Sequence, residues 1–121
     1  MTTFLVDVFG PRQGHFDAYT IGLNRDQLTI EHTPHRVVCK WIEGRDPVWE
    51  PKPDSLFDAL SNESTQAPEI LTKALVWVWT RWRYEELSDE EAEVEIKELF
   101  AWVNKITEIR PKTKFWTKFM Q

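Results

Sequence analysis

Two histidines and one cysteine stand close together in the sequence, and these residue types can bind a metal ion or act in nucleophilic catalysis. His32 and His35 flank Thr33-Pro34, and Cys39 follows four residues after His35. If a hairpin turns at Thr33-Pro34, His32 faces His35 across the strands, whereas Cys39 lies about 13 Å along the strand from His35. The thiol is then too far from either imidazole for a Cys-His site. We therefore interpret Cys39 as a small core residue.

A metal site at the two histidines needs further ligands, because zinc sites use three or four protein side chains. An acid such as Glu31 or Asp17 could be a further ligand. Glu31 alternates to the opposite face of the sheet from His32. Since only two ligands converge convincingly, the sequence predicts no metal and no cofactor.

Asp7 is the acid with the most apolar surroundings, since it stands beside Leu5 and Phe9 in the first predicted strand. A carboxylate in such a setting can serve as a general base. We name Asp7, Tyr19 and His32 as weak candidates for a pocket that would take a small apolar ligand. The sequence has no phosphate loop, GxSxG, HExxH or dinucleotide fingerprint. It therefore favours a non-enzymatic protein, with a small enzyme as the alternative.

The bulk composition fits a single globular domain over residues 1–121, with 41% hydrophobic and 29% charged residues. The N-terminus has no basic region, and no run of about 18 apolar residues occurs, so we expect no targeting segment and no membrane span. A lone cysteine forbids an intramolecular disulfide and favours a reducing compartment. These features together predict a cytoplasmic protein.

Charge is distributed unevenly along a chain whose net charge is -5. Residues 85–98 hold eight acids and one lysine, whereas residues 105–121 hold five bases and one acid. An acidic helix surface repels phosphate, so we do not expect nucleic acid as a partner.

The C-terminal segment, residues 112–121, combines lysines with Phe115, Trp116, Phe119 and Met120. We expect this segment to dock on the core or against the acidic start of the last helix. Binding to a membrane surface or to a partner's groove is the alternative.

Hydrophobic residues alternate in four runs over the first 43 residues, which predicts four strands near 4–8, 19–23, 28–30 and 37–41. Short connections rich in turn residues make neighbouring strands antiparallel. We therefore expect a four-stranded meander. Residues 44–54 contain three prolines and are predicted to be a crossing segment rather than a strand.

Three helices are expected after the sheet. The first is a short helix capped by Asp54, and the second runs from near Pro68 to about Leu87. The third begins at Ser88, which can form a capping box with Glu91. This order predicts an α+β fold, in which three helices pack on one face of an antiparallel sheet and a short C-terminal segment follows.

The second predicted helix carries two apolar stripes on nearly opposite sides. Ile70, Trp77 and Tyr84 are spaced by seven and form one of them. The other, which we assign to the core, consists of Leu71, Leu75, Val78 and Trp82. One planar sheet cannot cover both stripes. Something else must therefore cover Trp77: another segment of the chain, a second subunit or a ligand.

Another segment of the chain is the first explanation for such a cover, because a buried central helix is apolar all round. A second subunit is supported by Arg81, four residues after Trp77, because arginine and aromatic residues are enriched at interfaces. Trp49, held between Pro47 and Pro51, could join such a surface because rigid presentation lowers the entropy lost on binding. Our leading hypothesis is a small soluble binding or interaction protein that forms a homodimer or binds a protein partner. Its surface would consist of Trp77, Arg81, Tyr84, Ile70 and Trp49. The alternative is a small-molecule-binding protein or small enzyme with an aromatic pocket between sheet and helices.

Overall fold

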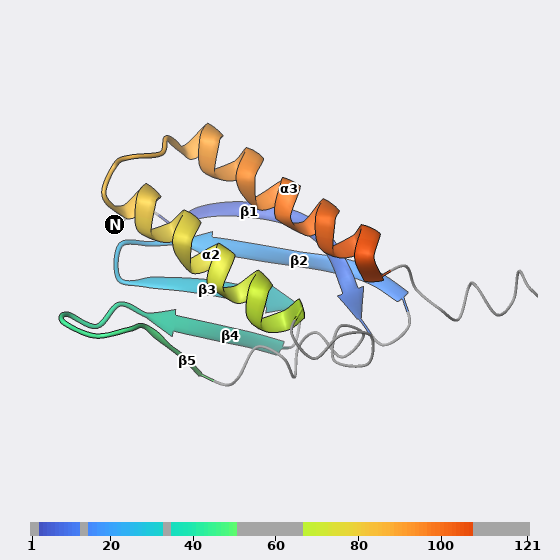
Figure 1. The fold of residues 1–121 in the computed structure, drawn as a ribbon, viewed down its shortest axis with the longest axis horizontal. Helices are drawn as coiled ribbons and strands as arrows, with labels where there is room; N and C mark the ends of the chain where they lie inside the picture. Colours follow the sequence, from blue (N-terminus) through green and yellow to red (C-terminus); the bar gives the residue numbers. More distant parts are fainter. Residues whose placement is uncertain (1–2, 13–14, 33–34, 51–66, 108–121) are drawn as a thin grey trace, which may run out of the picture.

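Five strands form one antiparallel sheet and lie side by side in sequence order (Figure 1). The computed structural model describes residues 3–12, 15–32, 35–50 and 67–107. The strands are β1 (Phe4–Arg12), β2 (His15–Leu23), β3 (Gln27–His32), β4 (His35–Lys40) and β5 (Val48–Glu50). The first four lie where the alternation of hydrophobic residues predicts them.

One face of the sheet supplies half of the hydrophobic core, because successive side chains of a strand point to opposite faces. In β1, for example, Val6 and Val8 are buried while Asp7 between them is exposed. The buried strand side chains are Val6, Val8, Tyr19, Ile21, Leu23, Leu28, Ile30, Val37 and Cys39. The alternation in the sequence thus identifies the core face of the sheet correctly.

The prediction of a four-stranded meander is wrong, because β5 pairs with β4 and places Trp49 directly opposite Cys39. β5 is three residues long and stands between Pro47 and Pro51 in the sequence. It lies at the edge of the sheet, where one side of a strand needs no hydrogen-bonded neighbour and prolines are tolerated. The prolines of this segment therefore flank a short edge strand rather than exclude one.

Two helices are present in the described residues, α2 (Ala67–Arg83) and α3 (Asp89–Thr107). They run in opposite directions across the same face of the sheet (Figure 1). The prediction of three helices is thus wrong for the part of the chain that the structure describes. The short helix expected after Asp54 and the C-terminal segment 112–121 both lie outside the described residues.

The buried side of the two helices completes the core. Trp79 is fully buried, and its indole N–H donates to the backbone carbonyl of Asn24 at 2.7 Å. On α3, the amide of Asn104 donates to the backbone carbonyl of Phe9 at 2.8 Å. The buried helix side chains include Leu71, Leu75, Val78, Trp79, Ala92, Ile96, Phe100 and Val103. These two hydrogen bonds fix each helix against the sheet while satisfying polar backbone groups.

α2 ends at Arg83 rather than near Leu87, because the chain turns into a left-handed conformation at Glu85, whose φ is 62°. The N–H of Glu85 donates to the carbonyl of Trp82 at 3.0 Å, and the N–H of Glu86 donates to that of Arg81 at 2.7 Å. This pair of bonds is a Schellman ending, which usually has glycine at the left-handed position. Glutamate at that position gives no sequence signal for the end of a helix, so the predicted helix extends past the observed end at Arg83.

The capping box predicted at the start of α3 is confirmed. The N–H of Ser88 donates to Glu91 Oε1 at 3.0 Å, and the N–H of Glu91 donates to Ser88 Oγ at 3.1 Å. Both bonds satisfy donors that the first helical turn would otherwise leave without partners. No described helix is long and apolar enough to cross a membrane.

We predict that Glu85→Gly raises the free energy of unfolding by about 1 kcal/mol, because glycine adopts the left-handed conformation without a steric cost. Glu86→Gly is the matched control. It adds the same flexibility to the unfolded chain, but it does not relieve a residue in the left-handed conformation. Urea unfolding of both variants measures the difference. A Glu85→Gly variant no more stable than the control contradicts this account of the helix end.

Candidate functional site

A groove with tryptophan walls runs between α2 and α3, away from the buried stripes that face the sheet. Trp77 of α2 is 59% exposed and Trp102 of α3 is 40% exposed. The groove is lined by Ala74, Trp77, Val78, Arg81, Glu95, Glu98, Leu99 and Trp102, and we call it the outer helix groove. Its floor is apolar, and the charged side chains lie along its length.

Arg81 joins the two sides of the outer helix groove. Its guanidinium carbon lies 5.0 Å from the centre of the Trp77 ring, within the range of a cation–π contact. The same guanidinium donates two hydrogen bonds to the carboxylate of Glu95, one of them at 3.1 Å. This forked geometry is the strong form of an arginine–carboxylate pair. Trp77 is therefore held against a fixed charged group rather than left to move freely on the surface.

The remaining predicted surface residues do not all belong to this groove. Ile70, two turns before Trp77, is 48% exposed and extends the apolar strip along α2. Tyr84 lies beyond the end of α2, and its ring packs edge-on against Trp41 with 5.9 Å between ring centroids. Trp49 is on β5 and packs partly buried against the core. The early end of α2 thus separates Tyr84 from the stripe that the spacing of seven predicts.

Glu95 and Trp102 were not predicted as site residues. The sequence did carry a signal, because they are seven residues apart and so share one face of the third helix. Glu95 could not be singled out, since it is one of many acids in residues 85–98. Its role depends on the packing of α3 against α2, which no local pattern describes.

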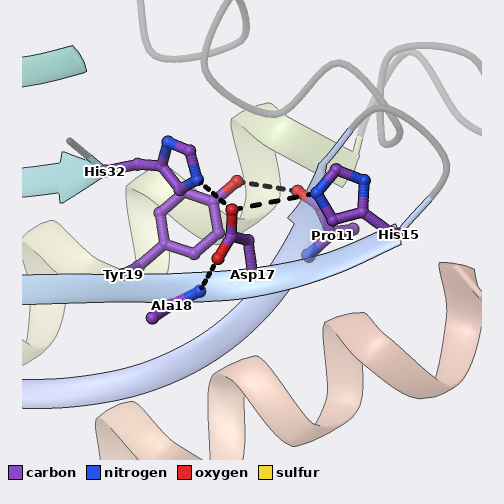
Figure 2. Close-up of polar contacts among 6 residues, drawn as sticks. All are labelled: Pro11, His15, Asp17, Ala18, Tyr19 and His32. Atoms are coloured by element: carbon purple, nitrogen blue, oxygen red, sulfur yellow. Dashed lines mark hydrogen bonds and ion pairs between the residues drawn. The ribbon is translucent and has the colours of Figure 1, made fainter. Parts of the chain in front are cut away.

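A second group of polar side chains lies at one end of β2 and β3 (Figure 2). His32 Nε2 is 2.6 Å from Asp17 Oδ2, and Asp17 Oδ1 accepts a hydrogen bond from the N–H of Ala18 at 2.8 Å. The Tyr19 hydroxyl donates to the backbone carbonyl of Pro11 at 2.7 Å. The Tyr19 and His32 rings are 5.2 Å apart between centroids. We call these residues the histidine cluster.

Tyr19 is positioned by the close approach of its ring to the backbone of β1. A Cβ on Gly10 would lie only 2.9 Å from Tyr19 Cε1 and 3.1 Å from Phe100 Cε2. Only glycine leaves room for both rings at this point. The ring of Tyr19 is therefore clamped between β1 and α3, beside the histidine cluster.

The pKa of the Asp17 carboxyl lies below its ordinary value of 3.8, mainly because of the hydrogen bond from His32 and then because of the Ala18 N–H. An ionised Asp17 accepts the bond, so His32 Nε2 carries the proton. His32 Nδ1 is buried and has no hydrogen-bond partner in the described part of the chain. A carboxylate that orients an imidazole is an arrangement suited to general base catalysis. The nearby Tyr19 hydroxyl, however, donates to the backbone.

Two more histidines border the histidine cluster. His15 Nε2 is 3.8 Å from the same Asp17 oxygen, and the rings of His32 and His35 are stacked with 6.4 Å between centroids. The predicted pairing of His32 with His35 is confirmed. Within the described ranges, no group of three or more His, Cys, Asp or Glu side chains is arranged to hold a metal ion.

Asp7 and Cys39 stand apart from the histidine cluster. Asp7 lies on the opposite face of the sheet, where it accepts a hydrogen bond from the Thr20 hydroxyl at 3.0 Å. Cys39 is opposite Leu28 and is fully buried, so its interpretation as a core residue is confirmed. Burial raises the pKa of its thiol to about 11, so the reactive thiolate is scarce at neutral pH. Of the three pocket candidates, the structure brings Tyr19 and His32 together and leaves Asp7 out.

Comparison with known proteins identifies relatives of this fold. A family model described as an integron cassette protein matches residues 2–107. The chain also resembles the solved structure of an integron cassette protein from the mobile metagenome of V. cholerae, with a TM-score of 0.76 and 27% sequence identity. That similarity covers 97% of this chain and 93% of the other. No curated protein matches the chain.

We predict that Asp17→Asn lowers the free energy of unfolding at neutral pH, because a neutral amide is a weaker acceptor for His32. Since the folded-state pKa of Asp17 is lowered, its contribution is present above the unfolded value near 3.8 and is lost as the pH falls through the folded value. Urea unfolding at a series of pH values from about 6 to about 3 should therefore show the difference between the two proteins shrinking once the pH falls below about 3.8. A difference that stays constant across that range contradicts this assignment.

Proposed function

This chain belongs to the integron cassette protein family, and we propose that it is a small interaction protein that self-associates through the outer helix groove. The observation that carries the proposal is Trp77. It is a large aromatic side chain with 59% of its surface exposed, in a groove with an apolar floor. Tryptophan and arginine are the residue types most enriched among side chains that dominate binding energy.

Apolar side chains extend the groove along both helices. Ile106 follows Trp102 on α3 by four residues, so the two share one side of that helix. The exposed apolar side chains along this side of the helix pair are Ile70, Trp77, Trp102 and Ile106. Large apolar patches on monomeric proteins often mark binding surfaces. Covering it would remove apolar area from water and stabilise a complex.

The groove is also organised in advance of binding. The contacts of Arg81 with Trp77 and Glu95 fix three long side chains before a partner arrives. Less rotamer freedom is then lost on association, so more of the gain from apolar burial is retained. A fixed aromatic side chain beside an arginine is typical of the residues that contribute most to binding energy at protein interfaces.

A second copy of the chain is the partner that this surface favours. The two charges at its centre, on Arg81 and Glu95, neutralise each other within one chain. An identical surface therefore meets no unpaired charge from Arg81 or Glu95 at that point. Symmetric pairs of identical subunits are also the commonest form of protein oligomer.

The alternative of an aromatic pocket between sheet and helices gains no support from the described residues. Tyr19, Trp79 and Phe100 lie in that layer and are almost fully buried. Tyr19 and Phe100 pack closely, with 6.1 Å between ring centroids. Close packing of large rings leaves no room for a ligand among them.

We predict that Trp77→Ala abolishes self-association, because it removes the exposed anchor and the cation–π partner of Arg81. The fold should survive, since Trp77 contributes little buried area. Sedimentation velocity over a range of concentrations measures the change in association, and circular dichroism checks the fold.

Phe9→Ala is the matched control, because Phe9 is 67% exposed but lies on the opposite face of the sheet. Its association should equal that of the unaltered chain. A Trp77→Ala variant that associates as before, or an unaltered chain that stays monomeric at every concentration, refutes the proposed function.

A further inference from the structure

The outer helix groove has the chemistry of a site for a basic, aromatic helix or peptide. Its floor is formed by Ala74, Val78 and Leu99, and Trp77 and Trp102 stand at its sides. Glu98 is exposed beside it and has no ion-pair partner among the described residues. Grooves of this form bind amphipathic segments whose apolar side chains recur at helical spacing. An acidic edge favours a segment that carries lysines.

The chain contains one segment of matching chemistry. Residues 112–120 carry Phe115, Trp116, Phe119 and Met120, spaced so that one turn and a half of helix would present them together. Three lysines, at positions 112, 114 and 118, are interleaved with them. By contrast, residues 89–98 of α3 hold six acids and one lysine. The segment and the α3 side of the groove are therefore complementary in both apolar spacing and charge.

We propose that residues 112–120 of one copy bind in the outer helix groove of a second copy, and that the exchange is reciprocal. The inference rests on the proposed self-association and identifies the part of the partner that covers Trp77. Residues 108–121 follow the end of α3 and lie outside the described residues. Two exchanged segments would fill two grooves, and such exchange of an element is a low-cost route to a dimer.

The position and sequence of the linker favour a second copy over the same chain. α3 ends at Thr107, only five residues after Trp102, so the groove lies behind the direction in which the chain leaves the helix. A return to the same groove needs a tight reversal. Residues 108–111 are Glu, Ile, Arg and Pro, and proline is the only one of the four that is typical of turns. Proline also biases the residue before it towards extended conformations.

A complementation experiment with full-length chains tests this proposal. One variant, Trp77→Ala, has a damaged groove and an intact segment. The other, Phe115→Ala with Trp116→Ala and Phe119→Ala, has a damaged segment and an intact groove. Each alone should need a concentration at least about tenfold higher than the unaltered chain for half-association. An equimolar mixture should form a heterodimer, because one intact groove can still receive one intact segment.

Thr113→Ala with Thr117→Ala is the matched control, since it alters polar positions of the same segment and should associate normally. If the segment variant associates like the unaltered chain while Trp77→Ala does not, the inference fails but the proposed function stands. If both variants are monomeric and the mixture remains monomeric, exchange between copies is refuted. If Trp77→Ala associates at the same concentration as the unaltered chain, the proposed function itself fails. Sedimentation velocity with one variant fluorescently labelled distinguishes these results.

Discussion

The structure depends on the burial of a single face of the sheet. Five antiparallel strands present one continuous apolar face, and α2 and α3 lie across it (Figure 1). Each helix can bury only one stripe in this arrangement, because the sheet lies on one side of it. Trp79 is on the buried side of α2 and is fully covered, whereas Trp77, two residues earlier, remains 59% exposed. The exposed aromatic surface is therefore a direct consequence of a two-layer fold.

The two polar features of the molecule differ in what they contribute. In the histidine cluster, the hydrogen bond between Asp17 and His32 links the neighbouring strands β2 and β3 beside Tyr19. We interpret it as a structural contact whose strength depends on the protonation of Asp17. In the outer helix groove, the bond between Arg81 and Glu95 joins two helices and holds an exposed tryptophan. Because the second arrangement fixes a largely exposed side chain, it supports the proposed role in binding.

Sequence patterns predicted the features that depend on contacts between residues close together in the chain. Alternating hydrophobic residues located β1 to β4, and the Ser88–Glu91 pair located the start of α3. β5 was missed because three residues between prolines carry too little pattern. The end of α2 was missed because a glutamate occupies the left-handed position. Asp17 was considered only as a possible metal ligand, together with Glu31. Its hydrogen bond with His32 was missed because it depends on the register of β2 against β3.

The proposed cover of Trp77 by a second copy can be measured by hydroxyl-radical footprinting of the unaltered chain over a range of concentrations. Mass spectrometry reports the oxidation of Trp77 separately from that of the buried Trp79, which serves as an internal reference. Trp77 should be readily oxidised in dilute protein and become protected as the concentration rises. If Trp77 is oxidised equally at every concentration, no second copy covers it.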